Sequence, residues 1–294
     1  MYGRWPDVAL LTVPPRSRAG ERRLWRQLRG VPIDAAVVFA PSLRTALVPW
    51  LLRIPRRIGF RTDRRGPLLT DAVPSGSRER HLARQFLDLA VRLGADAAAP
   101  LDPRLPVGED EREAAGDRLR EIGFAGEETV ALCPGATYGE TKRWPLASWL
   151  ALSSALIAGG RTIVVLGGGE EVAAGEAIAR NGGAAAQSLA GRLSLRESLA
   201  MLGRLAGCVS NDSGAMHLAA AAGCPVVGVF GSTNPSWTGP LGARARVVTL
   251  GLACSPCYSS RCPTSIECLR DLDPDRVRAA LLGLLEQAPP EGAG

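Results

Sequence analysis

The alternation of short apolar segments with longer amphipathic ones after residue 129 is the feature that most limits how this chain can fold. The apolar segments predict strands at residues 130–133, 162–166, 187–189, 208–210 and 226–230. The segments between them predict helices at residues 146–158, 171–180, 195–205 and 213–222, and a further helix is expected after Pro274. Strands that alternate with helices in this way form a parallel sheet with helices on both faces, so the sequence predicts a doubly wound α/β domain.

The first part of the chain has a less regular pattern. Residues 8–13 and 35–39 resemble short buried strands, and residues 22–29, 43–52 and 81–93 have the spacing of helices. A Pro-rich and acidic stretch, residues 97–113, is typical of a linker and leads into a helix near residues 112–122. We therefore expect two domains, residues 1–110 and residues 111–294, each long enough to bury its own core.

The N-terminal segment is strongly basic, because residues 1–84 contain 17 Arg against 6 Asp or Glu. Such a segment is either a solvated surface or a surface that binds an acidic partner. Its few aromatic residues are not interleaved with the arginines, which argues against nucleic acid and favours a phosphorylated saccharide or a membrane surface. No segment approaches the roughly 20 apolar residues of a spanning helix. Residues 1–15 lack the order of a signal peptide, so we expect a cytoplasmic protein.

Lys142 is the single lysine among 35 basic residues, and it lies in the loop that follows the first predicted strand of the second domain. In this loop, residues 133–145, Gly135 and Gly139 allow a tight turn with exposed amides. Thr137 offers a hydroxyl, and Lys142 offers a compact positive charge that suits a phosphate. The Gly-Lys-Ser/Thr sequence of a Walker loop is absent, so we expect a phosphate site of another kind.

A second candidate site lies where residues 210–217 pass from a strand into a helix of small residues. Asp212 is expected to be the N-cap, which leaves the amides of Ser213 and Gly214 at a positive helix terminus, a common way to hold a diphosphate. His217 lies one turn further on, where it could reach the same ligand. The loop at residues 230–240 brings further hydroxyls to this edge, because the carboxyl ends of parallel strands lie together.

The seven cysteines fall into two groups. Cys133, Cys208 and Cys224 lie inside apolar segments and are expected to be small core residues. The other four could bind zinc or form a loop of reduced thiols; their spacing is not that of paired C-x2-C knuckles, and we predict no metal site. They are Cys254, Cys257, Cys262 and Cys268.

These motifs together resemble the ADP-heptose:lipopolysaccharide heptosyltransferases, and within that family the heptosyltransferase II group most of all. The residues that carry the resemblance are Pro134-Gly-Ala, Lys142-Arg-Trp-Pro, Asn211-Asp-Ser-Gly with His217, Phe230-Gly, Pro41 to Pro49 and Ile54 to Arg61. The resemblance implies a GT-B fold, two Rossmann-like domains that face a cleft, with the N-terminal one incomplete. It also implies inverting transfer of heptose from ADP-L-glycero-D-manno-heptose to the lipopolysaccharide inner core, without a cofactor or metal.

The resemblance also implies roles for individual residues. Lys142 and His217 would be catalytic, and Arg44 and Arg61 would meet a lipid-linked, phosphorylated core saccharide at the inner face of the cytoplasmic membrane. The donor would be bound by Thr137, Tyr138, Lys142, Glu171, Leu193, Asp212, Ser213, Gly214 and His217. Glu170 is an alternative to Glu171 as the partner of the ribose, and Leu193 has an alternative role in the core.

The chain departs from the family at its start, where members have a strand, a Gly-containing loop and an Asp suggested as the general base. Asp7 and Asp34 are poor substitutes, because the first is terminal and the second precedes a strand. Two alternatives therefore stay open: a truncated relative that binds a nucleotide-sugar without transferring it, and a family member with another donor or acceptor.

Overall fold

The computed structural model describes residues 18–287, and the chain divides into two compact units, Met1–Leu101 and Asp102–Gly294. The division lies inside the predicted linker rather than at residue 110. Helix α4 (Glu109–Glu121) begins earlier than expected and packs on helix α7 (Leu195–Leu202) of the second unit. The strand predicted at residues 8–13 and Asp7 lie outside the described residues.

The first unit is built on a parallel three-stranded sheet of order β1-β2-β3. Its strands are β1 (Ala35–Val38), β2 (Arg56–Phe60) and β3 (Asp71–Val73), and its helices are α1 (Arg18–Leu28), α2 (Leu43–Leu51) and α3 (Leu82–Val91). The three predicted helices and the strand at residues 35–39 are confirmed. The core is small and gathers Ile58, Phe60, Val73 and Leu89, so α3 packs against the sheet through the apolar side that its spacing predicts.

The second unit contains a six-stranded, fully parallel sheet of order β6-β5-β4-β7-β8-β9. Its strands are β4 (Thr129–Cys133), β5 (Thr162–Val165), β6 (Ala186–Ser188), β7 (Gly207–Asn211), β8 (Val226–Val229) and β9 (Ala245–Val248). Besides α4, its helices are α5 (Leu146–Ala158), α6 (Val172–Gly182), α7 (Leu195–Leu202), α8 (Gly214–Ala221), α9 (Pro235–Thr238), α10 (Glu267–Arg270) and α11 (Pro274–Leu285). The predicted strands and helices are confirmed, and β9, α9 and α10 are additional.

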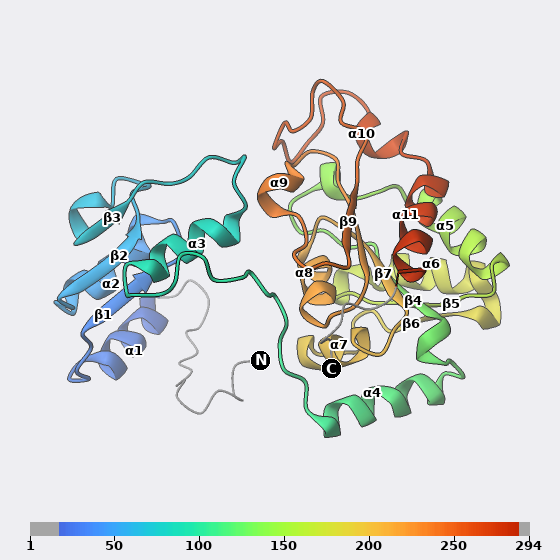
Figure 1. Ribbon diagram of the computed structural model, residues 1–294, viewed down its shortest axis with the longest axis horizontal. Coiled ribbons are helices and arrows are strands. Elements are labelled where there is room, and N and C mark those ends of the chain that lie inside the picture. Colours follow the sequence, from blue (N-terminus) through green and yellow to red (C-terminus); the bar gives the residue numbers. More distant parts are fainter. Residues whose placement is uncertain (1–17, 288–294) are drawn as a thin grey trace. The chain divides into compact units, whose positions relative to one another are not determined.

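Helices cover both faces of this sheet (Figure 1). Side chains of a strand alternate between the two faces of the sheet, so each central strand contributes residues to two separate hydrophobic cores. Val130 and Leu132 point to the core that contains α5, α6 and α11, whereas Ala131 and Cys133 point to the core that contains α7 and α8. Burial on both faces explains why these strands are continuous apolar segments rather than alternating ones.

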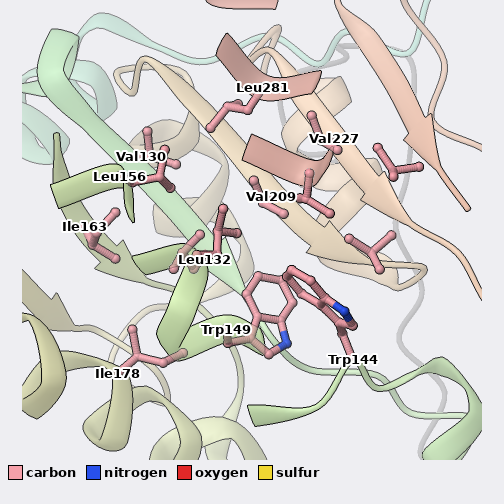
Figure 2. Packing of buried hydrophobic residues seen from close by; sticks show 14 of the residues in the cluster. Val130, Leu132, Trp144, Trp149, Leu156, Ile163, Ile178, Val209, Val227 and Leu281 are labelled. Carbon is pink, nitrogen blue, oxygen red and sulfur yellow. The ribbon is translucent and has the colours of Figure 1, made fainter. Parts of the chain in front are cut away.

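Two tryptophans join the loop after β4 to the first of these cores (Figure 2). Trp144 ends the loop and Trp149 lies on α5; their ring centroids are 5.1 Å apart in an edge-to-face arrangement. The indole N–H of Trp144 also donates to the carbonyl of Leu272 at 3.3 Å. The end of the loop that carries Lys142 is thus fixed by core packing.

The strand order places a topological switch point between β4 and β7, because the chain leaves β4 towards β5 and later returns to β7 on the other side. Ligands of doubly wound sheets bind beyond the carboxyl ends of the strands at such a point. The loops after β4 and β7 are those that carry Lys142 and Asp212. No helix among residues 18–287 has the length and apolar character needed to cross a bilayer.

Candidate functional site

Lys142 and Asp212 meet at the switch point. The ammonium of Lys142 lies 2.6 Å from Oδ2 of Asp212, and the two side chains are 16% and 5% exposed. Lys142 ends a short 3-10 turn, Glu140–Lys142, in the loop after β4, and Asp212 directly follows β7. The loops after β4 and β7, which the sequence places at one edge of the sheet, are therefore brought together by a cation and a strand-end carboxylate.

Asp212 is not the N-cap of α8, so that prediction is wrong. The N-cap is Ser213, whose backbone is extended and whose side chain makes no capping hydrogen bond. The amide of Asp212 still donates to the carbonyl of Val229 at 3.1 Å, so the strand pairing reaches Asp212, beyond the predicted strand end at residue 210. The carboxylate is consequently directed to Lys142 rather than to the helix.

Asn211 fixes both ends of the loop that carries Lys142. Its side-chain N–H donates to the carbonyl of Pro134 at 2.7 Å, and its side-chain oxygen accepts from the amide of Trp144 at 3.2 Å. Asn211 is completely buried, so these two bonds satisfy polar groups that water does not reach. Asn211 was part of the motif but was not predicted as a site residue; a buried amide at a strand end is the signal that marks it.

The loop after β8 joins the same site through buried hydroxyls. Thr233 donates to Oδ2 of Asp212 at 2.5 Å, and Ser232 donates to the hydroxyl of Thr141 at 3.2 Å. Both side chains are buried. Three loops, after β4, β7 and β8, thus converge, although the sequence did not distinguish which hydroxyls make the contacts.

The start of α8 presents the predicted anion-binding groups. Gly214 begins the helix, and a Cβ added to it would meet nothing within 4 Å, so there is open space beside its backbone. The first amides of a helix have no partner inside the helix and carry a partial positive charge. His217 is exposed three residues further along, within the first turn.

Tyr138 lies beside the ammonium. Its ring centroid is 5.4 Å from Nζ of Lys142, and its hydroxyl donates to the carbonyl of Tyr258 at 2.7 Å. Contact of this kind between an ammonium and an aromatic face is attractive. Thr137 is exposed on the same loop.

Glu171 lies between the loops after β4 and β5. Its Oε2 accepts from the amide of Gly168 at 2.8 Å, and a Cβ on Gly135 would lie 2.6 Å from its carboxyl group. The glycine therefore makes room for the Glu171 side chain at this edge of the sheet. Glu170, the alternative, is exposed and its carboxylate is 3.7 Å from the guanidinium of Arg143.

Leu193 lies in the loop between β6 and α7 and is half-buried. It packs against the core under α7 and α8 and also lines a pocket of about 550 Å³ between α4 and α7. Leu193 therefore has the core role that was its alternative, and it also faces a pocket.

Arg44 and Arg61 belong to the first unit, where both are exposed at the carboxyl edge of the sheet. Arg44 is in the first turn of α2, after β1, and Arg61 directly follows β2. Asp34 lies before β1, at the opposite edge, which agrees with its interpretation as a strand-entry residue. The carboxylate of Asp63 accepts from the amide of Leu43 at 2.6 Å and so holds the start of α2.

Arg65 organises this edge and was not predicted. It is fully buried, and its guanidinium donates to the carbonyl of Phe60 at 2.7 Å, to that of Val38 at 3.4 Å and to that of Ala40. Burial lowers the pKa of the Arg65 guanidinium, and the nearby charge of Asp63 opposes this effect. The ends of β1 and β2, and with them the segments that carry Arg44 and Arg61, are thus held by one buried cation.

The cysteines divide as predicted into two groups. Cys133, Cys208 and Cys224 are buried free thiols, with 3.8 Å between the sulfurs of Cys133 and Cys208, so their role as core residues is confirmed. Of the others, Cys254 and Cys257 are exposed. Burial and then the neighbouring thiols Cys254, Cys257 and Cys262 raise the pKa of Cys268. Residues 18–287 contain no group of three or more His, Cys, Asp or Glu arranged to hold a metal ion.

The architecture is that of the GT-B glycosyltransferases, the class to which the fold and the site assign this chain. The solved structure of E. coli ADP-heptose lps heptosyltransferase II matches it with a TM-score of 0.74 and 30% identity, over 90% of this chain and 80% of that one. E. coli heptosyltransferase WaaC with ADP has the same fold, with a TM-score of 0.66 at 19% identity, over 90% and 77% of the two chains.

Sequence comparison identifies the family. The model of glycosyltransferase family 9 (heptosyltransferase) matches residues 21–266, and the chain belongs to this family. Lipopolysaccharide heptosyltransferase 2 of Salmonella typhimurium is 34% identical over 241 residues, which cover 78% of this chain and 68% of that protein. The protein of the same name from Escherichia coli K12 is 33% identical over 244 residues, 79% and 69% of the two chains.

Proposed function

We propose that this glycosyltransferase transfers heptose from ADP-L-glycero-D-manno-heptose to the lipopolysaccharide inner core, with inversion at the transferred carbon. The observation that carries the proposal is the Lys142–Asp212 pair at the switch point, 2.6 Å apart. The names of the relatives, lipopolysaccharide heptosyltransferase 2 and ADP-heptose lps heptosyltransferase II, support this donor and this acceptor.

The proposed donor site uses groups that carry full or partial positive charge to bind the diphosphate. Lys142 and the amides of Ser213 and Gly214 bind the diphosphate, and His217 and Asp212 contact the diphosphate and the sugar. Around them, Thr137 and Tyr138 lie beside the phosphates, Glu171 binds the ribose and Leu193 lies against the adenine. The support for Glu171 over Glu170 is its position between the loops after β4 and β5.

The proposed chemistry follows from where charge develops. When the bond between the sugar and the phosphate breaks, negative charge grows on the departing ADP. Hydrogen-bond donors and cations fixed around that charge stabilise the transition state more than the ground state. The Lys142 ammonium is held in place for this role by Asp212 and by the contacts of its loop. His217 would assist as a second hydrogen-bond donor to the departing ADP.

The proposed acceptor site lies in the first unit. Arg44 and Arg61 are exposed at one edge of the three-stranded sheet, and the paired N–H groups of arginine suit phosphate. We propose that they bind the phosphorylated saccharide of a lipid-linked acceptor. The chain would then act peripherally at the inner face of the cytoplasmic membrane.

A donor titration followed by a product assay separates transfer from binding alone. We expect ADP-heptose to bind and heptose to appear on a heptose-accepting lipopolysaccharide core. Binding without product would favour the alternative of a relative that only holds the nucleotide-sugar, and product from a different nucleotide-sugar would favour another donor.

A further inference from the structure

The segment between β9 and α10 is long and is attached to the donor site. Residues 249–266, which we call the cysteine loop, form neither helix nor strand and contain Cys254, Cys257 and Cys262. Ordered loops of this length are uncommon in compact domains and are usually functional. Neither Lys142 nor Asp212 belongs to it, but its hydrogen bonds reach the loop after β4 and the segment after β8.

The cysteine loop is hydrogen-bonded to three of the four residues that directly precede Lys142. The bonds run from the Tyr138 hydroxyl to the carbonyl of Tyr258 at 2.7 Å, from the Thr141 hydroxyl to the carbonyl of Ser259 at 2.5 Å, and from the amide of Cys262 to Oε1 of Glu140 at 3.2 Å. Thr141 is only 2% exposed, so its bond is sheltered from water. The short turn that carries Lys142 is therefore held from outside by this loop.

Gly139 makes this close contact possible. Its φ is +143°, and a Cβ at this position would lie 2.4 Å from the carbonyl oxygen of Ser260. Both the backbone conformation and the lack of space exclude any side chain here. The two loops are thus fitted to each other at the residue that begins the Lys142 turn.

The same loop also holds the segment after β8. The amide of Tyr258 donates to the carbonyl of Ser232 at 2.8 Å, and the Ser255 hydroxyl donates to the carbonyl of Gly231. The next residue in that segment, Thr233, donates to Asp212. The cysteine loop therefore bridges the two segments that hold the two members of the Lys142–Asp212 pair.

We infer that the cysteine loop is a positioning element for the donor site, and that Thr141 is the residue through which it sets the place of the Lys142 ammonium. The inference rests on the proposed function. The hydroxyl of Thr141 accepts from Ser232 and donates to Ser259, so it links the three segments at one atom. Loss of the Thr141 hydroxyl removes this link from the Lys142 turn without removing any group that touches the donor.

The test compares Thr141→Val with Thr141→Ser and with Thr129→Val. Thr129 is a matched control, because it is a fully buried threonine whose hydroxyl also donates to a carbonyl, that of Ala125, but at the amino end of β4. ADP binding is measured by calorimetry, KM for ADP-heptose by kinetics, and folding by thermal unfolding.

We expect Thr141→Val to weaken ADP binding and raise KM for ADP-heptose about three- to tenfold, the range that one net hydrogen bond corresponds to. Thr141→Ser should restore both, and Thr129→Val should leave both constants unchanged. Wild-type affinity in Thr141→Val, or an equal loss in Thr129→Val, would overturn the inference. A wild-type chain that binds no ADP would instead overturn the proposed function itself.

Discussion

The ammonium of Lys142 lies 2.6 Å from the carboxylate of Asp212, across the boundary between strands β4 and β7. This contact joins the single lysine of the chain to the strand end where the topology places a ligand. The carboxylate holds the ammonium, and Thr233 holds the carboxylate. The site is therefore a fixed arrangement rather than a flexible cation on a surface loop.

Replacement of Lys142 tests the charge that this site supplies. We expect Lys142→Ala to cost at least roughly 2 to 4 kcal/mol in the transition state, a fall in kcat/KM of about 30- to 1000-fold. Lys142→Arg keeps the charge but not the compact ammonium, so it should recover only part of the loss. The measurement is steady-state transfer of heptose, and an unchanged rate in Lys142→Ala would refute the proposed role.

Gly214 offers a substitution that separates folding from binding. Since an added Cβ meets nothing within 4 Å, Gly214→Ala should fold normally and gain about 0.4–1 kcal/mol of stability. The same methyl group should enter the space proposed for the diphosphate and raise KM for the donor roughly tenfold, the equivalent of about 1.4 kcal/mol.

The matched control for Gly214 is Gly283→Ala. Gly283 is also in a helix, α11, and a Cβ there likewise meets nothing within 4 Å. It should show the gain in thermal stability without any change in KM. A Gly214→Ala protein with wild-type KM would place the diphosphate elsewhere.

Asn211 is expected to matter for stability as well as for donor binding. Asn211→Ala leaves the carbonyl of Pro134 and the amide of Trp144 without their partner, which should lower the free energy of unfolding by about 1–3 kcal/mol. Denaturant unfolding measures this loss. Asn181→Ala, which removes an exposed asparagine of α6, should change the free energy by no more than about 0.5 kcal/mol. Equal effects of the two substitutions would contradict the conclusion that Asn211 holds both ends of the Lys142 loop.

Much of the second unit follows from local pattern. Its buried strands are continuous apolar segments, and several turns between strand and helix contain glycine. The succession of strands and helices along the chain, and the place of Lys142 in the loop after β4, could therefore be predicted. Strand β9 was missed because Arg246 interrupts a four-residue segment, and β2 was missed because its sequence begins with two arginines and contains Gly59. Such strands are recognised only when their partners in the sheet are known.

The contacts inside the site could be predicted only in part. Asp212 was expected to cap α8, since an aspartate before a helix usually does so, but the bond from its amide to Val229 extends the strand and leaves the carboxylate to Lys142. The roles of Asn211, Thr141 and Arg65 depend on partners that are distant in the sequence. No local pattern encodes such partners.

Arg65 carries a prediction for the first unit. Arg65→Ala removes a buried guanidinium from several carbonyls at the ends of β1 and β2, which should cost at least about 2 kcal/mol and loosen the segments of Arg44 and Arg61. Hydrogen exchange of the amides of β1 and β2 measures this effect within the unit. Arg92→Ala, at an exposed arginine after α3, serves as the control and should leave their exchange unchanged. Unaltered exchange in Arg65→Ala would contradict the conclusion that Arg65 holds the ends of β1 and β2.

A crystal structure of the protein with ADP tests the central claim most directly. We predict that a diphosphate oxygen lies within about 3.5 Å of Nζ of Lys142 and that another accepts from the amides at the start of α8. A diphosphate bound away from both groups, with Lys142 and Asp212 still paired to each other alone, would contradict the account.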